Sequence, residues 1–168
     1  PGGEVVAAAS EEGGVVTNGA SMHARDGRNA NAALLVNITP EDLPGDDPLE
    51  GVRLQRACEQ AAFRAGGGEY QAPAQLVGDF LARRPSTGPG RIEPTYPRGV
   101  TWGTIDDVLP PHVVDALREG IPLLDRKIRG YNDPEAVLTA IESRSSSPIT
   151  ILRDRQTCIS VSTPGLYP

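Results

Sequence analysis

The chain has 168 residues, 38% of them hydrophobic, and a formal net charge of -6 at pH 7. This length fits one domain spanning residues 1–168, and the apolar content is enough for a buried core. We expect no nucleic-acid partner, because the chain is negatively charged and has no basic stripe with interleaved aromatics. We expect no membrane partner, because no apolar run is long enough to span a bilayer.

The N-terminal region, residues 1–39, is predicted to be mainly β structure. Two short apolar runs, residues 4–9 and 15–17, are separated by a loop of five residues, a spacing that is typical of a hairpin. The polar stretch 18–31 is predicted to be a loop. The continuous apolar run 32–38 indicates a strand that is buried on both faces.

The middle region, residues 40–133, is predicted to be an inserted helical cap. Asp47, Pro48 and Glu50 form a helix start, because Asp can cap, Pro suits the first helical position and Glu completes a variant of the capping box. Apolar residues then recur at helical spacing until the glycines at 66–68, which are expected to end this helix.

Two further helices are expected in the same region. The shorter one begins near Pro73 and ends before Pro85. The longer one covers about 111–129, with a kink or a break at Pro122 because proline removes a backbone donor. Gly130 is the expected stop.

The last region, residues 134–168, returns to β structure, with strands predicted at 136–143, 149–153 and 157–161. The simplest architecture is therefore α+β, with a β-sheet built from both ends of the chain (1–39 and 134–168) and the helices inserted between them. The chain opens on Pro1-Gly2-Gly3 without a Met, which we interpret as a cut inside a longer protein.

The absence of several catalytic and nucleotide-binding motifs limits the enzyme classes to which the chain could belong. The sequence has no GxGxxG after an opening strand, no GxxxxGK[ST] loop, no HExxH and no GxSxG. A self-contained nucleotide-dependent enzyme or a standard hydrolase is therefore not expected. Cys58 and Cys158 lie far apart and form no metal-binding cluster, so we expect no metal site and a reducing, cytoplasmic environment.

Two polar loops carry the candidate site residues. The first holds Ser21, His23 and Arg25, where a histidine could exchange a proton on the substrate side. The alternative is a loop histidine satisfied by backbone groups. The second loop follows a predicted strand and concentrates hydroxyls around one guanidinium, a set suited to binding an anionic or carbonyl oxygen. Its members are Arg144, Ser145 and Ser146.

Gln75 is the remaining substrate-side candidate, because it lies near a predicted helix face that could point at a neighbouring domain. Arg126 shares that property, but with Lys127 and Arg129 it forms a basic cluster that complements the dipole at a helix C-terminus. His112 follows two prolines at a helix start, where a structural role is expected.

Taken together, several spaced segments resemble the uncharacterised FAD-dependent dehydrogenases. The segments are residues 1–6, 17–21 with Arg25, 72–75, 78–80, 124–128, 142–148 and 164–168. The resemblance covers nearly the whole chain. It implies that a dinucleotide-binding domain precedes this region as its partner, and that a glycine-rich flavin segment follows it.

What the resemblance implies for function is hydride chemistry at FAD, with this region covering the flavin and shaping the side where a small-molecule substrate binds. The protein orients the flavin and excludes water, while the flavin carries the redox chemistry. We expect the two polar loops to approach the flavin or substrate. The isolated piece is expected to be inactive and not to bind FAD tightly.

An alternative from a different class stays open: a non-catalytic module that binds another protein or its own parent chain. An exposed sheet edge would favour self-association of the isolated piece. A free-standing hydrolase using a serine and His23 is the third reading, but it lacks a recognised motif.

Overall fold

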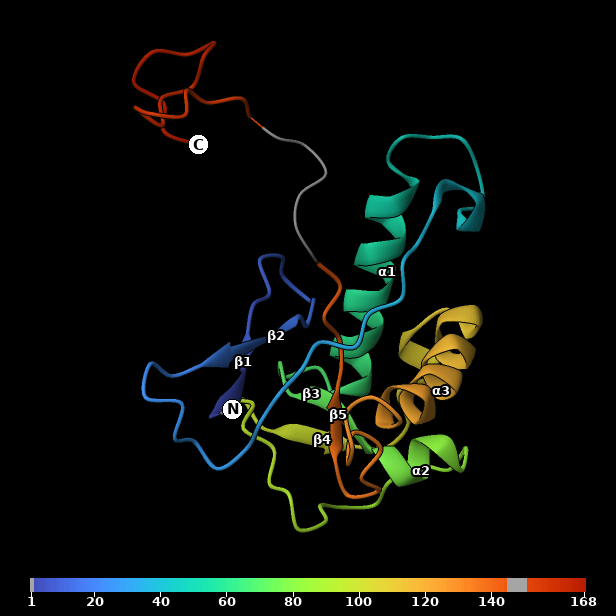
Figure 1. The fold of residues 1–168 in the computed structure, drawn as a ribbon. Coiled ribbons are helices and arrows are strands. Elements are labelled where there is room, and N and C mark those ends of the chain that lie inside the picture. The colour runs from blue at the N-terminus through green and yellow to red at the C-terminus, as the bar shows by residue number, and fades with distance from the viewer. Residues whose placement is uncertain (1, 145–150) are drawn as a thin grey trace.

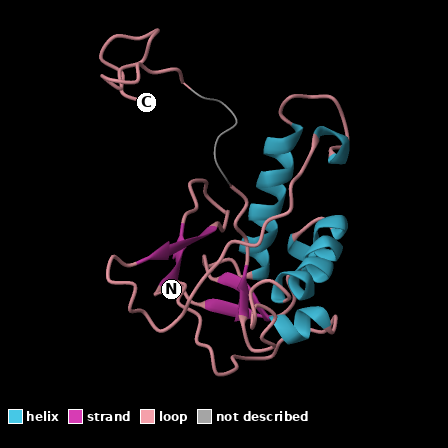
Figure 2. Cartoon of the chain, viewed as in Figure 1, coloured by secondary structure: helices cyan, strands magenta, loops and turns pink. Residues whose placement is uncertain are grey.

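The structure is a computed structural model that describes residues 2–144 and 151–168 (Figure 1). In chain order the elements are β1 (Gly3–Ala7), β2 (Thr17–Ser21), a 3-10 turn (Pro40–Asp42), α1 (Glu50–Ala65), β3 (Ala72–Leu76), α2 (Val77–Leu81), β4 (Val100–Trp102), a second 3-10 turn (Asp106–Val108), α3 (Pro111–Asp125) and β5 (Val137–Thr139). Helices and small sheets coexist, which confirms the predicted α+β class (Figure 2).

The strands form two sheets. β1 and β2 pair as an antiparallel hairpin, and the second sheet has the order β4-β3-β5, with β3 parallel to β4 and antiparallel to β5. The backbone N–H of Thr17 donates to the carbonyl of Ile141 at 2.8 Å, so the hairpin and the chain after β5 lie side by side. The two ends of the chain thus lie side by side without sharing a sheet, because the second sheet joins β5 to two strands, β3 and β4, of the middle region that was predicted to be helical.

The strand predictions were correct only in part. The hairpin is confirmed, although β2 extends into the stretch predicted as a loop. Residues 32–38 form no strand, and none of their backbone groups hydrogen bonds with another described backbone group. Of the three C-terminal strands, β5 is shorter than predicted, and residues 151–168 contain only an isolated bridge between Arg153 and Ser160. Residues 149 and 150 lie outside the described part of the chain.

The helix predicted from Pro73 is wrong over Ala72–Leu76, which is β3, and helix begins only at Val77. Four consecutive residues of β3 are buried, a pattern that suits a strand covered on both faces rather than one face of a helix. The ring of Pro73 removes one donor, but its carbonyl still accepts a hydrogen bond from the N–H of Ala140.

The two long helices largely follow the prediction. Before α1, the carboxylate of Asp47 accepts the N–H of Leu49 at 2.9 Å, so it caps a turn just ahead of the helix. Gly66 ends α1, and a side chain there would place its Cβ 1.8 Å from the carbonyl oxygen of Gln71. α3 continues through Pro122 but ends at Asp125, before the predicted limit.

A hydrophobic core joins the three helices to β3, with Phe80 and Ile121 among the largest fully buried side chains. Arg118 of α3 is almost buried beside this core. Its Nη2 donates to both carboxylate oxygens of Asp106 at 2.8 and 2.6 Å, and its guanidinium lies 4.5 Å from the centre of the Phe80 ring. Within the described residues, no helix is long and apolar enough to cross a membrane.

Candidate functional site

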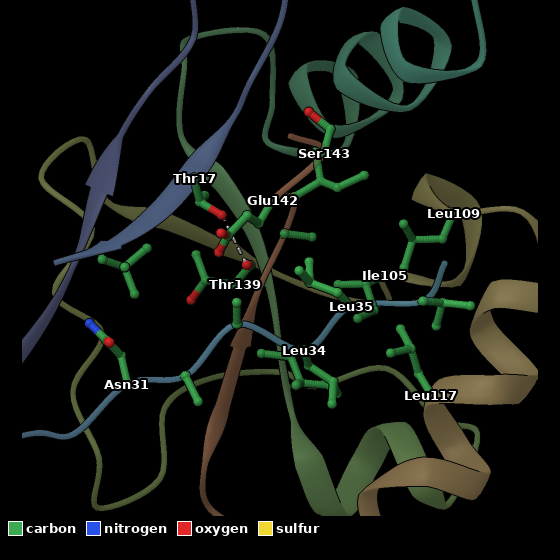
Figure 3. Close-up of a pocket in the computed structure, with 18 of the residues that line it drawn as sticks. Thr17, Asn31, Leu34, Leu35, Ile105, Leu109, Leu117, Thr139, Glu142 and Ser143 are labelled. Atoms are coloured by element: carbon green, nitrogen blue, oxygen red, sulfur yellow. Dashed lines mark hydrogen bonds between the residues drawn. The ribbon is translucent and has the colours of Figure 1, made fainter. Parts of the chain in front are cut away.

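A hollow of about 970 Å³ opens between β2, α1, α3 and the chain that follows β5 (Figure 3). Its size falls in the range of small-molecule sites. Most of its lining is apolar and comes from elements far apart in sequence. The apolar lining includes Leu34, Leu35, Leu54, Ile105, Leu109, Val113, Leu117 and Ile121.

One wall of the hollow is the irregular segment 29–43, which contains the apolar run 32–38. Leu34 and Val36 pack against the core, whereas Leu35 is 50% exposed. The apolar pattern therefore serves packing on one side of an extended segment without pairing it into a sheet. This explains why the pattern predicted a strand that the structure does not contain.

A polar end of the hollow is formed by Thr17, Thr139 and Glu142, which lie close together in Figure 3. The Thr17 hydroxyl donates to the backbone carbonyl of Thr139 at 3.4 Å. Burial raises the pKa of the Glu142 carboxyl. In residues 2–144 and 151–168 no hydrogen bond or ion pair engages that carboxyl, whereas Glu93, the other acid in the lining, pairs with Arg28.

Sequence reasoning missed Glu142 as a site residue. The available signal was a single carboxylate directly after the apolar run that contains β5. From the sequence alone such a residue could be exposed or partly buried. The hydrogen bond from the N–H of Thr17 to the carbonyl of Ile141 places the hairpin beside Glu142 and buries it in part. Ionisable groups with pKa values shifted by burial are enriched at functional sites, which is why Glu142 enters the candidate site here.

A second carboxylate, Glu59 of α1, lies nearby but is fully engaged. It accepts hydrogen bonds from Ser143 (2.6 Å), Gln55 (2.9 Å) and the guanidinium of Arg144 (3.1 and 3.2 Å). Burial acts to raise the pKa of Glu59, but these hydrogen bonds, led by the one from Arg144, outweigh burial and hold the pKa below its ordinary value.

Arg144, predicted to bind the cofactor, therefore ties the segment after β5 to α1. Its third guanidinium nitrogen donates to the Ser10 hydroxyl at 2.6 Å, which adds the hairpin loop to the same junction. Ser145 and Ser146, the other two predicted cofactor-binding residues, lie outside the described residues. Flavin contact by this loop stays a prediction.

The other predicted loop lies away from the hollow. Ser21 closes β2, and Ser21, His23 and Arg25 are exposed and do not line the hollow. A side chain at Gly2 would place its Cβ 2.4 Å from the backbone of Arg25, so this glycine lets the loop pack directly on the hairpin. The substrate-side role of the three residues remains a prediction.

Asn31 explains why glycines occur at positions 3 and 19, within two of the segments that carry the family resemblance. Its side-chain amide nitrogen donates to the carbonyls of Glu4 (2.7 Å) and Ala20 (2.9 Å), one on each strand of the hairpin. Side chains at Gly3 and Gly19 would come within 2.6 and 3.0 Å of this amide. These glycines therefore make room for an internal clamp.

Gln75 is fully buried in β3, far from an exposed helix face. Its amide nitrogen donates to the carbonyl of Arg84 at 2.8 Å, and its amide oxygen accepts the N–H of Ile105 at 3.0 Å. The amide thus satisfies two backbone groups of loops that flank the sheet. Contact of Gln75 with a substrate is not tested by this geometry and stays a prediction.

The N-termini of the two long helices do not fit the pyrophosphate of FAD. A helix N-terminus binds phosphate through free N–H groups, but the start of α1 carries Asp47 and Glu50, which repel an anion. At the start of α3, Pro110 and Pro111 lack N–H groups, and the N–H of Val113 bonds internally. In the described part of the chain, no cluster of three His, Cys, Asp or Glu could hold a metal ion.

A family model described as "FAD-dependent protein, C-terminal domain-like" matches residues 1–145. An uncharacterized protein from Clostridium beijerinckii is 51% identical over 168 residues, which cover 100% of this chain and 31% of that relative. The chain thus spans about a third of the length of the relative that it matches.

Proposed function

Because this chain belongs to the family of C-terminal domains of FAD-dependent proteins, we propose that it covers the flavin and forms the substrate side of a larger oxidoreductase. The observation that carries this proposal is the largely apolar hollow with a partly buried carboxylate, Glu142, in its lining. Flavin enzymes need a water-excluding site that orients the substrate, and an apolar hollow with few polar groups is suited to that task.

The pyrophosphate is assigned to another part of the larger protein. The described helix N-termini offer no site for it, and the relative extends well beyond the matched region. We propose that a dinucleotide-binding domain of the same protein holds FAD and meets this chain at the flavin. The substrate is then a small molecule, and the reaction is a dehydrogenation.

The two polar loops keep their proposed roles within this scheme. Ser21, His23 and Arg25 are exposed, so a neighbouring domain can reach them. Arg144 lies close to the hollow, since Ser143, which lines it, and Arg144 both bind Glu59. We propose that the Arg144 loop approaches the flavin, with Arg144 fixing its position on α1.

A flavin titration tests the proposal. We expect the full-length protein to retain FAD and this chain alone not to, as measured by flavin absorbance and fluorescence after gel filtration. In the full-length protein, Arg144→Ala should shift the flavin spectrum, whereas Ser10→Ala, which removes only the outer hydrogen bond of Arg144, should not. If the full-length protein binds no FAD, or if neither variant changes the spectrum, the proposal fails.

A non-catalytic interaction role is the second candidate, and the C-terminal segment supports it. Residues 151–168 expose large apolar side chains, such as Leu152 (69%), Val161 (64%) and Tyr167 (66%). Exposed apolar groups of this kind favour contact with another protein surface. Sedimentation of this chain and of a Leu152→Ser, Val161→Ser double variant tests it: the parent should self-associate and the variant should be monomeric.

A further inference from the structure

The hollow contains one ionisable group whose role is not structural. Glu142 lines it, is partly buried and has no partner in the described part of the chain. Moving a carboxylate out of water without a partner costs free energy, so a purely structural site would favour an apolar or amide side chain here. The position therefore suits a group that gains its partner when a ligand binds.

The other charged and titratable groups around the hollow do not supply that partner. Glu59 and Arg144 pair with each other across α1 and the segment after β5, and Glu93 pairs with Arg28 at 2.8 Å. Cys58 lies on α1, burial raises the pKa of its thiol, and it is neutral at pH 7. Of two further lining residues, Arg129 is exposed and Gln55 donates a hydrogen bond to Glu59.

We infer that the hollow binds an elongated apolar small molecule whose single polar end is a hydrogen-bond donor, an amine or a hydroxyl, placed against Glu142. The apolar lining accepts the hydrocarbon part, and the Thr17 hydroxyl and the Glu142 carboxylate accept or share the hydrogen bonds of the polar end. This inference rests on the proposed function, because it names the substrate class of the same site.

Charge complementarity separates this ligand class from its nearest competitor. A carboxylate-ended ligand would bring a second negative charge to Glu142, which is unfavourable in a partly desolvated site. Arg129 is the group that could favour such a ligand, but it is exposed at the rim, where water and salt weaken its field. An ammonium group, in contrast, forms a charge-assisted hydrogen bond with Glu142.

The experiment is calorimetric titration of the full-length protein with 1-octylamine, 1-octanol and octanoate. We expect 1-octylamine to bind most tightly and octanoate most weakly. Because the ammonium binds the ionised carboxylate, and burial raises the pKa of Glu142, octylamine affinity should rise as the pH is raised from acidic to neutral and Glu142 ionises.

Matched variants locate the effect. Glu142→Gln should weaken octylamine binding about tenfold and flatten its pH dependence, as expected for the loss of one charge-assisted hydrogen bond. Glu93→Gln removes a charge from the same rim, but Glu93 is already paired with Arg28, so octylamine affinity should change less than about twofold. Leu117→Trp, which fills the hollow, should weaken all three ligands.

Three results would overturn the inference: octanoate binding as tightly as octylamine, binding that is unchanged in Glu142→Gln, or no binding of any of the three ligands. The titration does not depend on flavin turnover. A full-length protein that lacks FAD but binds octylamine through Glu142 would contradict the proposed function and leave the ligand class intact. A protein that holds FAD but binds none of the three ligands would contradict the ligand class and leave the proposed function intact.

Discussion

Two carboxylates beside the same strand end have opposite environments. Glu59 is buried in α1 and accepts hydrogen bonds from three side chains, which keep its pKa low. Glu142 faces the hollow, has no partner in the described residues, and its pKa is raised by burial. The two acids lie on segments that contact each other. Ser143 and Arg144 directly follow Glu142 in the chain, and both bind Glu59 of α1.

The difference indicates that Glu59 stabilises the fold and that Glu142 is available to a ligand. A carboxylate with a full set of donors stabilises the fold, whereas removing its partners would leave a costly buried charge. A carboxylate without donors stabilises nothing and is free to respond to a ligand. The predictions below test whether this division holds, in order of expected effect.

The largest effect is expected for Glu59→Ala. The substitution leaves Arg144, Ser143 and Gln55 without their common acceptor and should lower the free energy of unfolding by about 2–4 kcal/mol. Urea unfolding of the chain measures it. Glu12→Ala, at an exposed position in the hairpin loop, is the control and should be neutral. Equal stability of the two variants would show that the Glu59 cluster does not hold the fold.

Gln75→Leu extends the comparison to a neutral buried group. The change keeps the side-chain size but leaves the N–H of Ile105 and the carbonyl of Arg84 without a partner, at a cost of about 2 kcal/mol. The same unfolding measurement applies, with the exposed Gln60→Leu as control. A stable variant with altered ligand binding would instead favour the substrate-side prediction for Gln75.

Asn31→Ala should have a moderate effect of about 1 kcal/mol, because the amide links both strands of the hairpin. Amide hydrogen exchange gives the sharper readout. Protection should fall in β1 and β2 and stay unchanged in α3, because the Asn31 side chain bonds to the two hairpin strands and not to α3. Uniform loss of protection would mean that the clamp supports the whole domain.

The pH dependence of stability should have opposite signs for the two carboxylates. The pKa of Glu59 is lowered in the folded state, so its stabilisation is present above its ordinary value of 4.5 and lost as the pH falls through the folded pKa. The pKa of Glu142 is raised, so its ionisation costs stability above the folded pKa, and this cost is relieved as the pH falls through that value.

The smallest effect therefore belongs to Glu142→Gln, which should stabilise the chain at pH 7 by up to about 1 kcal/mol by removing a partly desolvated charge. Glu59→Gln should instead destabilise it at pH 7 and remove part of the acid-induced loss. Unfolding curves collected between neutral and acidic pH measure both. Destabilisation by both variants at neutral pH would contradict the division between the two carboxylates.

Local signals in the sequence predicted the features that depend on neighbours in the chain. The hairpin and the end of α1 at Gly66 were predictable, because their signals act within a few residues. The start of α1 was predicted two residues early, since Pro48 lies in the turn before the helix and Leu49 is its N-cap. The strand β3 was missed because small residues around Pro73 carry a weak β signal, and its burial comes from β4 and β5.

The candidate site was less predictable because its parts come from distant segments. Sequence reasoning found polar loops, and the structure shows that Arg144 in one of them binds Glu59, 85 positions away. Glu142 became a site residue only through the contact between the hairpin and the chain after β5. Such long-range contacts leave no periodic pattern in a single sequence.

The most direct test of the account is the visible absorption spectrum of FAD in the full-length protein during titration with 1-octylamine. A ligand in the hollow lies on the proposed substrate side of the flavin, so the account predicts a saturable spectral shift that is lost in Glu142→Gln and kept in Glu93→Gln. Octylamine binding that calorimetry detects without any change in the flavin spectrum would contradict it, because the hollow would then lie away from the flavin.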